Sequence, residues 1–180
     1  LGGHGKSFCA GADLSWMRAM ADFSWEQNHA EAAGLAEMLW TIWSCPLPVV
    51  GRIHGDCYAG GVGLAAVCDV LVAAEGMHFC LSEAKLGLLP ATIGPYVVRA
   101  LGEQASRRYF TTAERFSAAR AHQLGLAHEV VAAIRAGATV SITARGAERL
   151  KRAAETLARD AGAAVAHDVL DMRERQAVAR

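Results

Sequence analysis

The sequence lacks the features that mark several large classes of protein. Lysine plus arginine and aspartate plus glutamate both number 18, so the formal net charge is zero. A balanced charge provides no overall field that would attract nucleic acid or an anionic membrane, and any anionic ligand must be held by local groups. The longest apolar run, near residues 62–73, is interrupted by Asp69 and is too short to span a bilayer. We therefore expect neither a nucleic-acid nor a membrane partner.

Disulfide and metal signatures are also missing. The cysteines are odd in number and form no C-x-x-C pair, which predicts reduced thiols in a cytoplasmic protein. The seven histidines form neither H-x-x-x-H nor H-E-x-x-H, so no metal site is expected, and we expect His54 to satisfy buried backbone groups. There is no G-x-S-x-G motif, which disfavours a serine hydrolase. The five cysteines are Cys9, Cys45, Cys57, Cys68 and Cys80.

The chain has enough apolar residues to form one hydrophobic core. Of its 180 residues, 53% are hydrophobic. Short apolar strands alternate with helical segments up to residue 131, which predicts an α/β core with ligand-binding loops at the strand ends. A short strand at 6–9 is expected to lead into a turn where Asp13 caps a helix. Further helices are predicted at 25–43, 95–102, 103–112 and 117–125, and strands at 47–55, 70–74, 77–81 and 127–131.

The character of the sequence changes after Ala132. Residues 137–172 read as a strand, an arginine-rich helix and a second strand, the form of a βαβ unit. We therefore divide the chain into a core, 1–132, and a tail, 133–180. The sequence opens at Leu1 without a methionine or a preceding strand, so the core is expected to lack its N-terminal part, and a targeting peptide stays an open alternative.

Two glycine turns stand out in the core. "FCAGADL" covers residues 8–14, and "YAGGVGLAAVCD" covers 58–69 with three glycines just ahead of an alanine-rich apolar run. Glycines at such a junction let the backbone approach a ligand closely. The second turn has neither the Walker nor the dinucleotide-binding spacing. By itself it indicates only a tight turn between a strand and a helix.

These two stretches and "FCLSEAKLGLLPATIGPYVVRALG", residues 79–102, occur in an order that resembles the crotonase, or enoyl-CoA hydratase/isomerase, superfamily. The resemblance covers residue 4 to about 131. It implies an α/β fold built as a spiral of ββα units, here incomplete at both ends. "GPYVV" and "RRYFTTAERF" are similar to bacterial 3-methylglutaconyl-CoA and isohexenylglutaconyl-CoA hydratases. The resemblance also implies that the substrate is an acyl-CoA and that no cofactor is needed beyond the CoA it carries. It further implies that the protein forms a homotrimer or hexamer.

The resemblance also implies an oxyanion site. Adding water to an α,β-unsaturated thioester, or moving its double bond, places negative charge on the thioester oxygen, and two fixed amide donors stabilise that charge. By resemblance the donors are the N–H groups of Ala12 and Gly60, and the start of the short helix after Gly60 adds to the same site. The backbone of Ala10, Gly11 and Gly61 is implied to contact the acyl-CoA.

Glu83 is the candidate acid–base residue. It follows an apolar strand, so its carboxylate is expected to enter a low-dielectric pocket that raises its pKa. A glutamate in "LSEAK" taken alone is more often a solvated loop residue, and the resemblance implies the catalytic role. Many hydratases of the superfamily have a second glutamate where this chain has Gly63. Because one glutamate is also what several isomerases of the superfamily use, isomerisation is the alternative to hydration.

The acyl end of the substrate is less well specified. A glutaconyl group carries a distal carboxylate that needs a cation, and Arg99, Lys85 and Arg52 are candidates, each also explicable as a solvated surface charge. Tyr96 and Val97 are expected to shape the acyl pocket, with helix core as an equal interpretation.

The tail supports a rival hypothesis. Residues 134–172 resemble a fragment of short-chain dehydrogenase/reductases, with Arg145 at the position of an NADP phosphate ligand and Asp168 where adenine is recognised. The glycine-rich phosphate turn and the Tyr-x-x-x-Lys motif of those enzymes are absent, which argues against an oxidoreductase. The simplest interpretation is a crotonase core joined to a foreign βαβ fragment. Since apolar faces would then stay uncovered, a non-catalytic, acyl-CoA-binding product is a third hypothesis.

Overall fold

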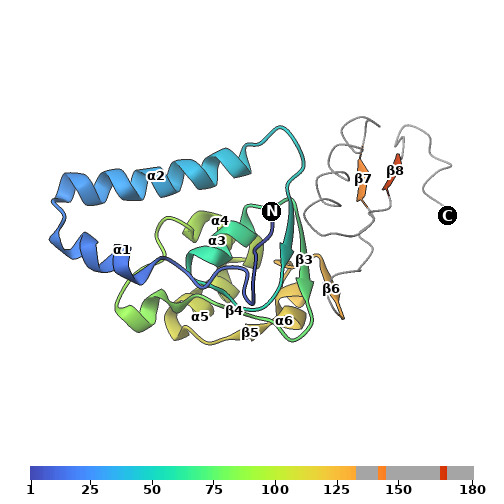
Figure 1. Ribbon diagram of the computed structural model, residues 1–180. Helices are drawn as coiled ribbons and strands as arrows, with labels where there is room; N and C mark the ends of the chain where they lie inside the picture. Colours follow the sequence, from blue (N-terminus) through green and yellow to red (C-terminus); the bar gives the residue numbers. More distant parts are fainter. Residues whose placement is uncertain (133–141, 145–166, 170–180) are drawn as a thin grey trace. The chain divides into compact units, whose positions relative to one another are not determined.

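The computed structural model describes residues 1–132, 142–144 and 167–169 (Figure 1). The chain divides into two compact units, Leu1–Ala132 and Ala133–Arg180.

The first unit alternates short strands with helices, as the pattern of apolar residues predicts. Its elements in chain order are α1 (Leu14–Ala19), the 3-10 helix η1 (Met20–Asp22), α2 (Trp25–Trp43), β1 (Val50–Ile53), β2 (Cys57–Tyr58), α3 (Gly60–Ala66), β3 (Val70–Ala74), β4 (His78–Cys80), the 3-10 helix η2 (Ser82–Leu86), α4 (Gly94–Leu101), α5 (Glu103–Thr112), β5 (Phe116–Ser117), α6 (Ala118–Gln123) and β6 (Glu129–Val131).

The strands form two small sheets. In the first, of order β1-β3-β6, neighbouring strands are parallel. In the second, of order β2-β4-β5, β2 and β4 are parallel while β5 runs antiparallel to β4. Because β2 and β4 point the same way, the segments that follow them, α3 and η2, leave the sheet at the same edge. This places the glycine turn before α3 next to the segment that contains Glu83.

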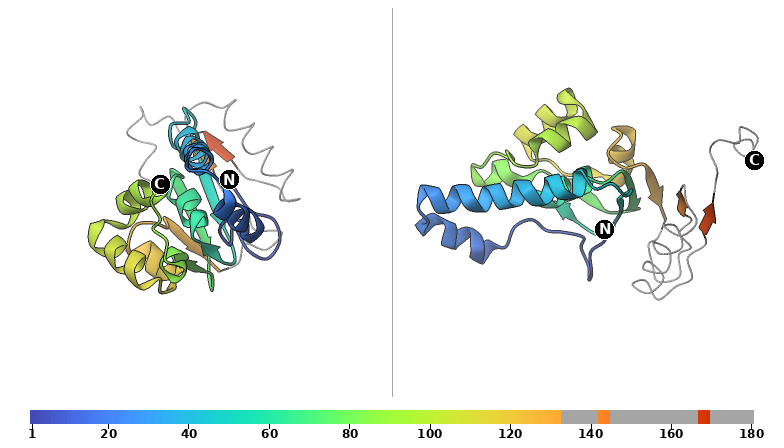
Figure 2. Two further views of the ribbon diagram at one scale, coloured as in Figure 1. Left: turned by 90° about the vertical axis from the view of Figure 1, so that its left-hand side faces the viewer. Right: turned by 90° about the horizontal axis from the view of Figure 1, so that it is seen from above.

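Local signals set the helix ends. The Asp13 carboxylate accepts hydrogen bonds from the Ser15 and Trp16 N–H groups at 2.6 and 3.1 Å and caps α1, as expected. Ser24 and Gln27 form a capping box at the start of α2. The two helices extend beyond the sheets (Figure 2), and Leu39 is the one buried residue of α2. Most of the large apolar side chains of α2 are therefore exposed.

The structure corrects the expected elements in detail. The strand predicted at 6–9 is reduced to an isolated parallel bridge between Cys9 and Cys57. The two-residue strands β2 and β5 were not predicted, because two residues are too few to show an alternating pattern. The helix expected from Pro95 begins one residue earlier, at Gly94, and ends before Gly102 as predicted.

Only two strands of the second unit are described. β7 (Ile142–Ala144) and β8 (His167–Val169) pair in parallel, with Ile142 opposite His167. Parallel pairing is what a βαβ unit requires. The helix predicted between the strands, and Arg145 with it, lie outside the described residues, whereas Asp168 lies in β8.

Candidate active site

Three segments far apart in the sequence meet at the carboxyl ends of β2 and β4. The Tyr58 N–H donates to the Cys9 carbonyl oxygen, and the Ala59 N–H donates to the Cys80 carbonyl oxygen, both at 2.8 Å. Cys9 lies in "FCAGADL", Tyr58 and Ala59 in the second glycine turn, and Cys80 three residues before Glu83. The backbone thus joins the three stretches on which the family resemblance depends.

Glycines allow these segments to touch. Gly11 has φ +106°, and a Cβ at that position would lie 3.3 Å from the Ala59 Cβ. A Cβ on Gly61 would lie 2.8 Å from the Cys9 Cβ and 2.9 Å from the Cys9 carbonyl oxygen, which is too close. Protein packing therefore accounts for Gly61.

Packing does not account for Gly60. A Cβ there would meet no atom within 4 Å, and the φ angle of Gly60 is not positive. A side chain at this position would therefore cause neither a clash nor backbone strain. Ala59, which precedes it, has φ 49° and ψ −122°, a rarely populated conformation for alanine that costs about 1–3 kcal/mol. Within the described part of the chain, the Ala12 and Gly60 N–H groups donate no backbone hydrogen bond. Both amide donors are therefore without a backbone acceptor in this part of the chain, and the Cβ direction of Gly60 is open.

Glu83 lies in η2, just after β4. Its side chain is half-buried, and its Oε2 is fully buried with no hydrogen-bond partner among the described residues. Burial raises the pKa of the Glu83 carboxyl above its ordinary 4.5. The expectation of a raised pKa is confirmed. A buried carboxyl oxygen without a partner is available to exchange a proton with a ligand.

Gly63 lies one turn after Gly60 and faces Ile93. A Cβ on Gly63 would lie 2.2 Å from the Ile93 Cγ2 and 2.6 Å from its Cβ. Both residues are buried, Ile93 being 3% exposed. The space in front of residue 63 therefore holds an isoleucine side chain.

The three candidate cations lie in different places. The Arg99 guanidinium stacks over the Trp43 ring at 4.3 Å and lines a cavity with Ala66 and Asp69, beyond the C-terminal end of α3 and thus at the opposite end of that helix from Gly60. Arg52 lies in β1, where its N–H donates to the Leu1 carbonyl oxygen. Lys85 lies in η2 and is exposed. Of the three, only Lys85 shares an element with Glu83.

A fourth cation, Arg115, was missed by sequence reasoning. Tyr58 pairs with Cys80 across β2 and β4, and Arg115 immediately precedes β5. The Arg115 guanidinium lies 5.2 Å from the centre of the Tyr58 ring. No local signal could have found this contact, since it depends on the antiparallel register of β5.

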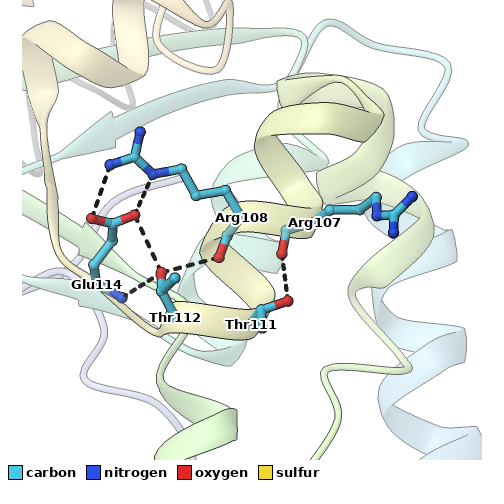
Figure 3. A network of polar contacts seen from close by, with 5 residues as sticks. All are labelled: Arg107, Arg108, Thr111, Thr112 and Glu114. Carbon is cyan, nitrogen blue, oxygen red and sulfur yellow. Dashed lines mark hydrogen bonds and ion pairs between the residues drawn. The ribbon is translucent and has the colours of Figure 1, made fainter.

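A polar network at the end of α5 leads into that strand (Figure 3). Arg108 forms a two-pronged ion pair with Glu114, the residue before Arg115, and the Glu114 carboxylate also accepts from the Thr112 hydroxyl at 3.2 Å. Ala113 between them takes the left-handed conformation with φ 49°. The network closes the turn from α5 to β5.

The remaining residues singled out from the sequence differ in their burial and contacts. Val97 is fully buried, so the interpretation as helix core is confirmed for it. Tyr96 is half-buried with its ring 5.8 Å from that of Trp43, and its role in an acyl pocket stays a prediction. The His54 Nε2 lies 2.9 Å from the Gly5 carbonyl oxygen, so His54 contacts backbone as expected, but the backbone group is exposed and not buried. Ala10 and Ala12 are exposed on the segment before α1.

The described residues hold neither a metal-binding cluster nor a membrane-spanning helix. Among the residues described, no three histidine, cysteine or acidic side chains are grouped so as to hold a metal ion. None of the helices in this part of the chain combines the length and apolar character needed to cross a membrane. All five cysteines are free thiols; Cys57, Cys68 and Cys80 are buried, whereas Cys45 is exposed.

Comparison with known proteins agrees with this geometry. The sequence profile of the enoyl-CoA hydratase/isomerase family matches residues 1–180. An enoyl-CoA hydratase of Alternaria alternata, ACTT6, is 38% identical over 130 residues, covering 72% of this chain and 42% of that protein. The peroxisomal Delta(3,5)-Delta(2,4)-dienoyl-CoA isomerase of Arabidopsis thaliana is 31% identical over 144 residues, covering 72% and 50%. The chain belongs to the enoyl-CoA hydratase/isomerase family.

A solved structure confirms the fold. The enoyl-CoA hydratase/isomerase (crotonase) of Legionella pneumophila superposes with a TM-score of 0.70 at 46% identity, covering 72% of this chain and 50% of the other. The fold is thus crotonase-like α/β, as predicted. The chain spans about half the length of these relatives. The resemblance of the tail to short-chain dehydrogenase/reductases stays a prediction.

Proposed function

We propose that this chain carries the acid–base and oxyanion residues of an acyl-CoA hydratase that adds water to an α,β-unsaturated acyl-CoA. One observation carries the proposal. Among the residues that the structure describes, the Ala12 and Gly60 N–H groups have no backbone acceptor, and they lie on segments joined to the strand before Glu83, whose buried Oε2 has no hydrogen-bond partner there. Family membership supports the acyl-CoA substrate. We further propose that no cofactor is needed beyond the CoA of the substrate, and that the protein is cytoplasmic.

In the proposed reaction the thioester oxygen accepts hydrogen bonds from the Ala12 and Gly60 amides. The Glu83 carboxylate takes a proton from water as the water oxygen bonds to C3. The electrons of the C2–C3 double bond then shift toward the thioester oxygen and form an enolate, which the two amides stabilise. Glu83 returns the proton to C2, and the enolate collapses to the 3-hydroxyacyl-CoA. Burial raises the pKa of Glu83, which makes its carboxylate a stronger base toward water than an exposed carboxylate.

For the substrate we propose 3-methylglutaconyl-CoA or a longer isoprenoid homologue. The support is the "GPYVV" and "RRYFTTAERF" stretches and the presence of two cations, Lys85 and Arg115, near β4. Either could pair with the distal carboxylate of a glutaconyl group. A homotrimer or hexamer is proposed by analogy with the family.

Isomerisation is the second candidate. A base that moves one proton between C2 and C4 needs only one carboxylate, which is what the site presents, and one relative of this chain is named as a dienoyl-CoA isomerase. A third candidate is an acyl-CoA-binding product without catalysis.

One assay separates the three candidates. The full chain is incubated in deuterated water with 3-methylglutaconyl-CoA and, separately, with a 3-enoyl-CoA, and the products are followed by mass spectrometry. The mass gain of one water supports the hydratase. Deuterium uptake with a displaced double bond supports the isomerase instead. If neither occurs while acyl-CoA still binds, as measured by calorimetry, the chain is a binding protein. Glu75→Gln, on an exposed side chain, is the control for each activity.

A further inference from the structure

We propose that Ile93 is a specificity-determining residue of this site, because it occupies the space that a side chain on residue 63, one helical turn after Gly60, would need. The proposal rests on the proposed function and extends it to the choice between hydration and double-bond migration. Its basis is the contact between Ile93 and Gly63, which no local pattern in the sequence indicates.

The contact leaves no room for a side chain at residue 63 of α3. A Cβ on Gly63 would lie 2.2 Å from the Ile93 Cγ2, far inside the distance that two carbon atoms tolerate. Residues 60 and 63 are three apart on a helix and lie on neighbouring positions of one face. The direction from Gly60 is open, whereas the direction from Gly63 is filled by Ile93.

The position of Ile93 is held by the backbone. The Gly94 N–H donates to the Pro90 carbonyl oxygen at 2.9 Å, and the Val97 N–H donates to the Ile93 carbonyl oxygen at 3.1 Å. Ile93 is thereby the N-cap residue of α4 and ends the loop that begins at η2, the element of Glu83. The loop that follows the acid–base residue therefore contacts α3 at Ile93.

The chemical consequence concerns water. A polar side chain on residue 63 could hold a water molecule or share its proton. An isoleucine side chain does neither, so Glu83 must both orient the water and move its proton. Ile93 thus lowers the rate of hydration relative to proton exchange on the acyl chain, without abolishing hydration.

A mutant cycle tests the proposal, using Gly63→Glu, Ile93→Gly and the double variant. Glycine is well tolerated at an N-cap, so Ile93→Gly changes mainly the side-chain volume. Gly63→Glu alone should lower the Tm sharply because of the clash, and the double variant should recover at least about half of that loss. Val98→Gly, on an exposed residue of the same helix, is the matched control and should restore nothing when combined with Gly63→Glu.

Activity is the second readout. In the double variant the ratio of hydration to deuterium exchange at C2 should rise at least about tenfold over the wild-type chain, and the pH profile should gain a second inflection from the new carboxylate. Additive changes in Tm would overturn the proposal, as would a folded double variant with an unchanged ratio and pH profile. If the wild-type chain neither hydrates nor exchanges any enoyl-CoA, the proposed function fails, and with it the reaction role of Ile93. Non-additive Tm values would then still establish the contact as packing.

Discussion

Cys9 packs directly against Gly61, so that a Cβ on Gly61 would lie 2.8 Å from the Cys9 Cβ and 3.2 Å from its Sγ. The contact joins the segment before α1 to the first turn of α3. Both free amides of the candidate site lie next to it, Gly60 one residue before Gly61 and Ala12 three residues after Cys9. The spacing of the two amides therefore depends on the packing of Gly61 against Cys9.

This arrangement predicts opposite outcomes for neighbouring glycines. Gly61→Ala should destabilise the protein by about 1–3 kcal/mol, because the new Cβ meets the Cys9 backbone. Gly60→Ala should leave stability nearly unchanged but lower kcat by about 10²-fold, because its Cβ would crowd the thioester oxygen. Urea unfolding and steady-state kinetics measure the two effects. The control is Gly34→Ala in α2, where the Cβ is also unobstructed, and a gain of about 1 kcal/mol is expected without any change in activity.

Glu83→Gln should abolish turnover while acyl-CoA binding persists. Removing the acid–base group should lower kcat by about 10²–10⁴-fold, and the amide keeps the shape of the side chain. Stopped-flow assays and calorimetric titration with a non-reactive acyl-CoA thioether provide the measurements. Retained activity in Glu83→Gln would remove Glu83 from the mechanism.

The buried carboxyl of Glu83 also predicts how stability depends on pH. Its native-state pKa lies above the ordinary 4.5, so the folded protein binds this proton more tightly than the unfolded chain. Stability should therefore fall as pH rises from about 4.5 through the native-state pKa. The Tm of Glu83→Gln minus the Tm of the wild-type protein should therefore be larger at pH 8 than at pH 4. A difference in Tm that does not vary with pH would contradict this prediction.

Thiol reactivity should separate the cysteines. Burial raises the pKa of the Cys68 thiol to about 11 and also raises those of Cys57 and Cys80. Because the thiolate is the reactive form, a thiol reagent at pH 8 should label the exposed Cys45 rapidly and these three only on unfolding. Peptide mapping after timed labelling tests this expectation. Rapid labelling of Cys57 in the native protein would show that the second sheet opens.

The cations near β4 predict a preference for acidic acyl groups. If Lys85 or Arg115 pairs with a distal carboxylate, replacing that residue by alanine should raise KM for 3-methylglutaconyl-CoA by about tenfold and leave KM for crotonyl-CoA unchanged. Arg99→Ala is the matched control, since Arg99 stacks on Trp43 at the other end of α3. Equal KM changes for both substrates would argue against recognition of the carboxylate.

The sequence by itself determined the local structure and the family. Asp13 caps α1 and Ser24 begins α2 because capping depends on a few neighbouring residues, and the strands and helices up to residue 131 follow the spacing of apolar side chains. Three motifs in order were enough to identify the fold, and an apolar strand before Glu83 was enough to predict its raised pKa.

The tertiary structure alone decided which distant residues touch. The strands β2 and β5 are too short to leave a periodic signal, and they form because β4 lies between them. The stacking of Arg115 on Tyr58 depends on the register of that sheet, and the filling of the Gly63 position by Ile93 depends on how α4 packs on α3. Such contacts depend on the shape and register of segments far apart in the chain. The pattern of residues along one segment carries no information about them. At Gly61 and Gly63 other protein atoms occupy the space that a Cβ would need. At Gly60 that space is open, so packing does not require a glycine there.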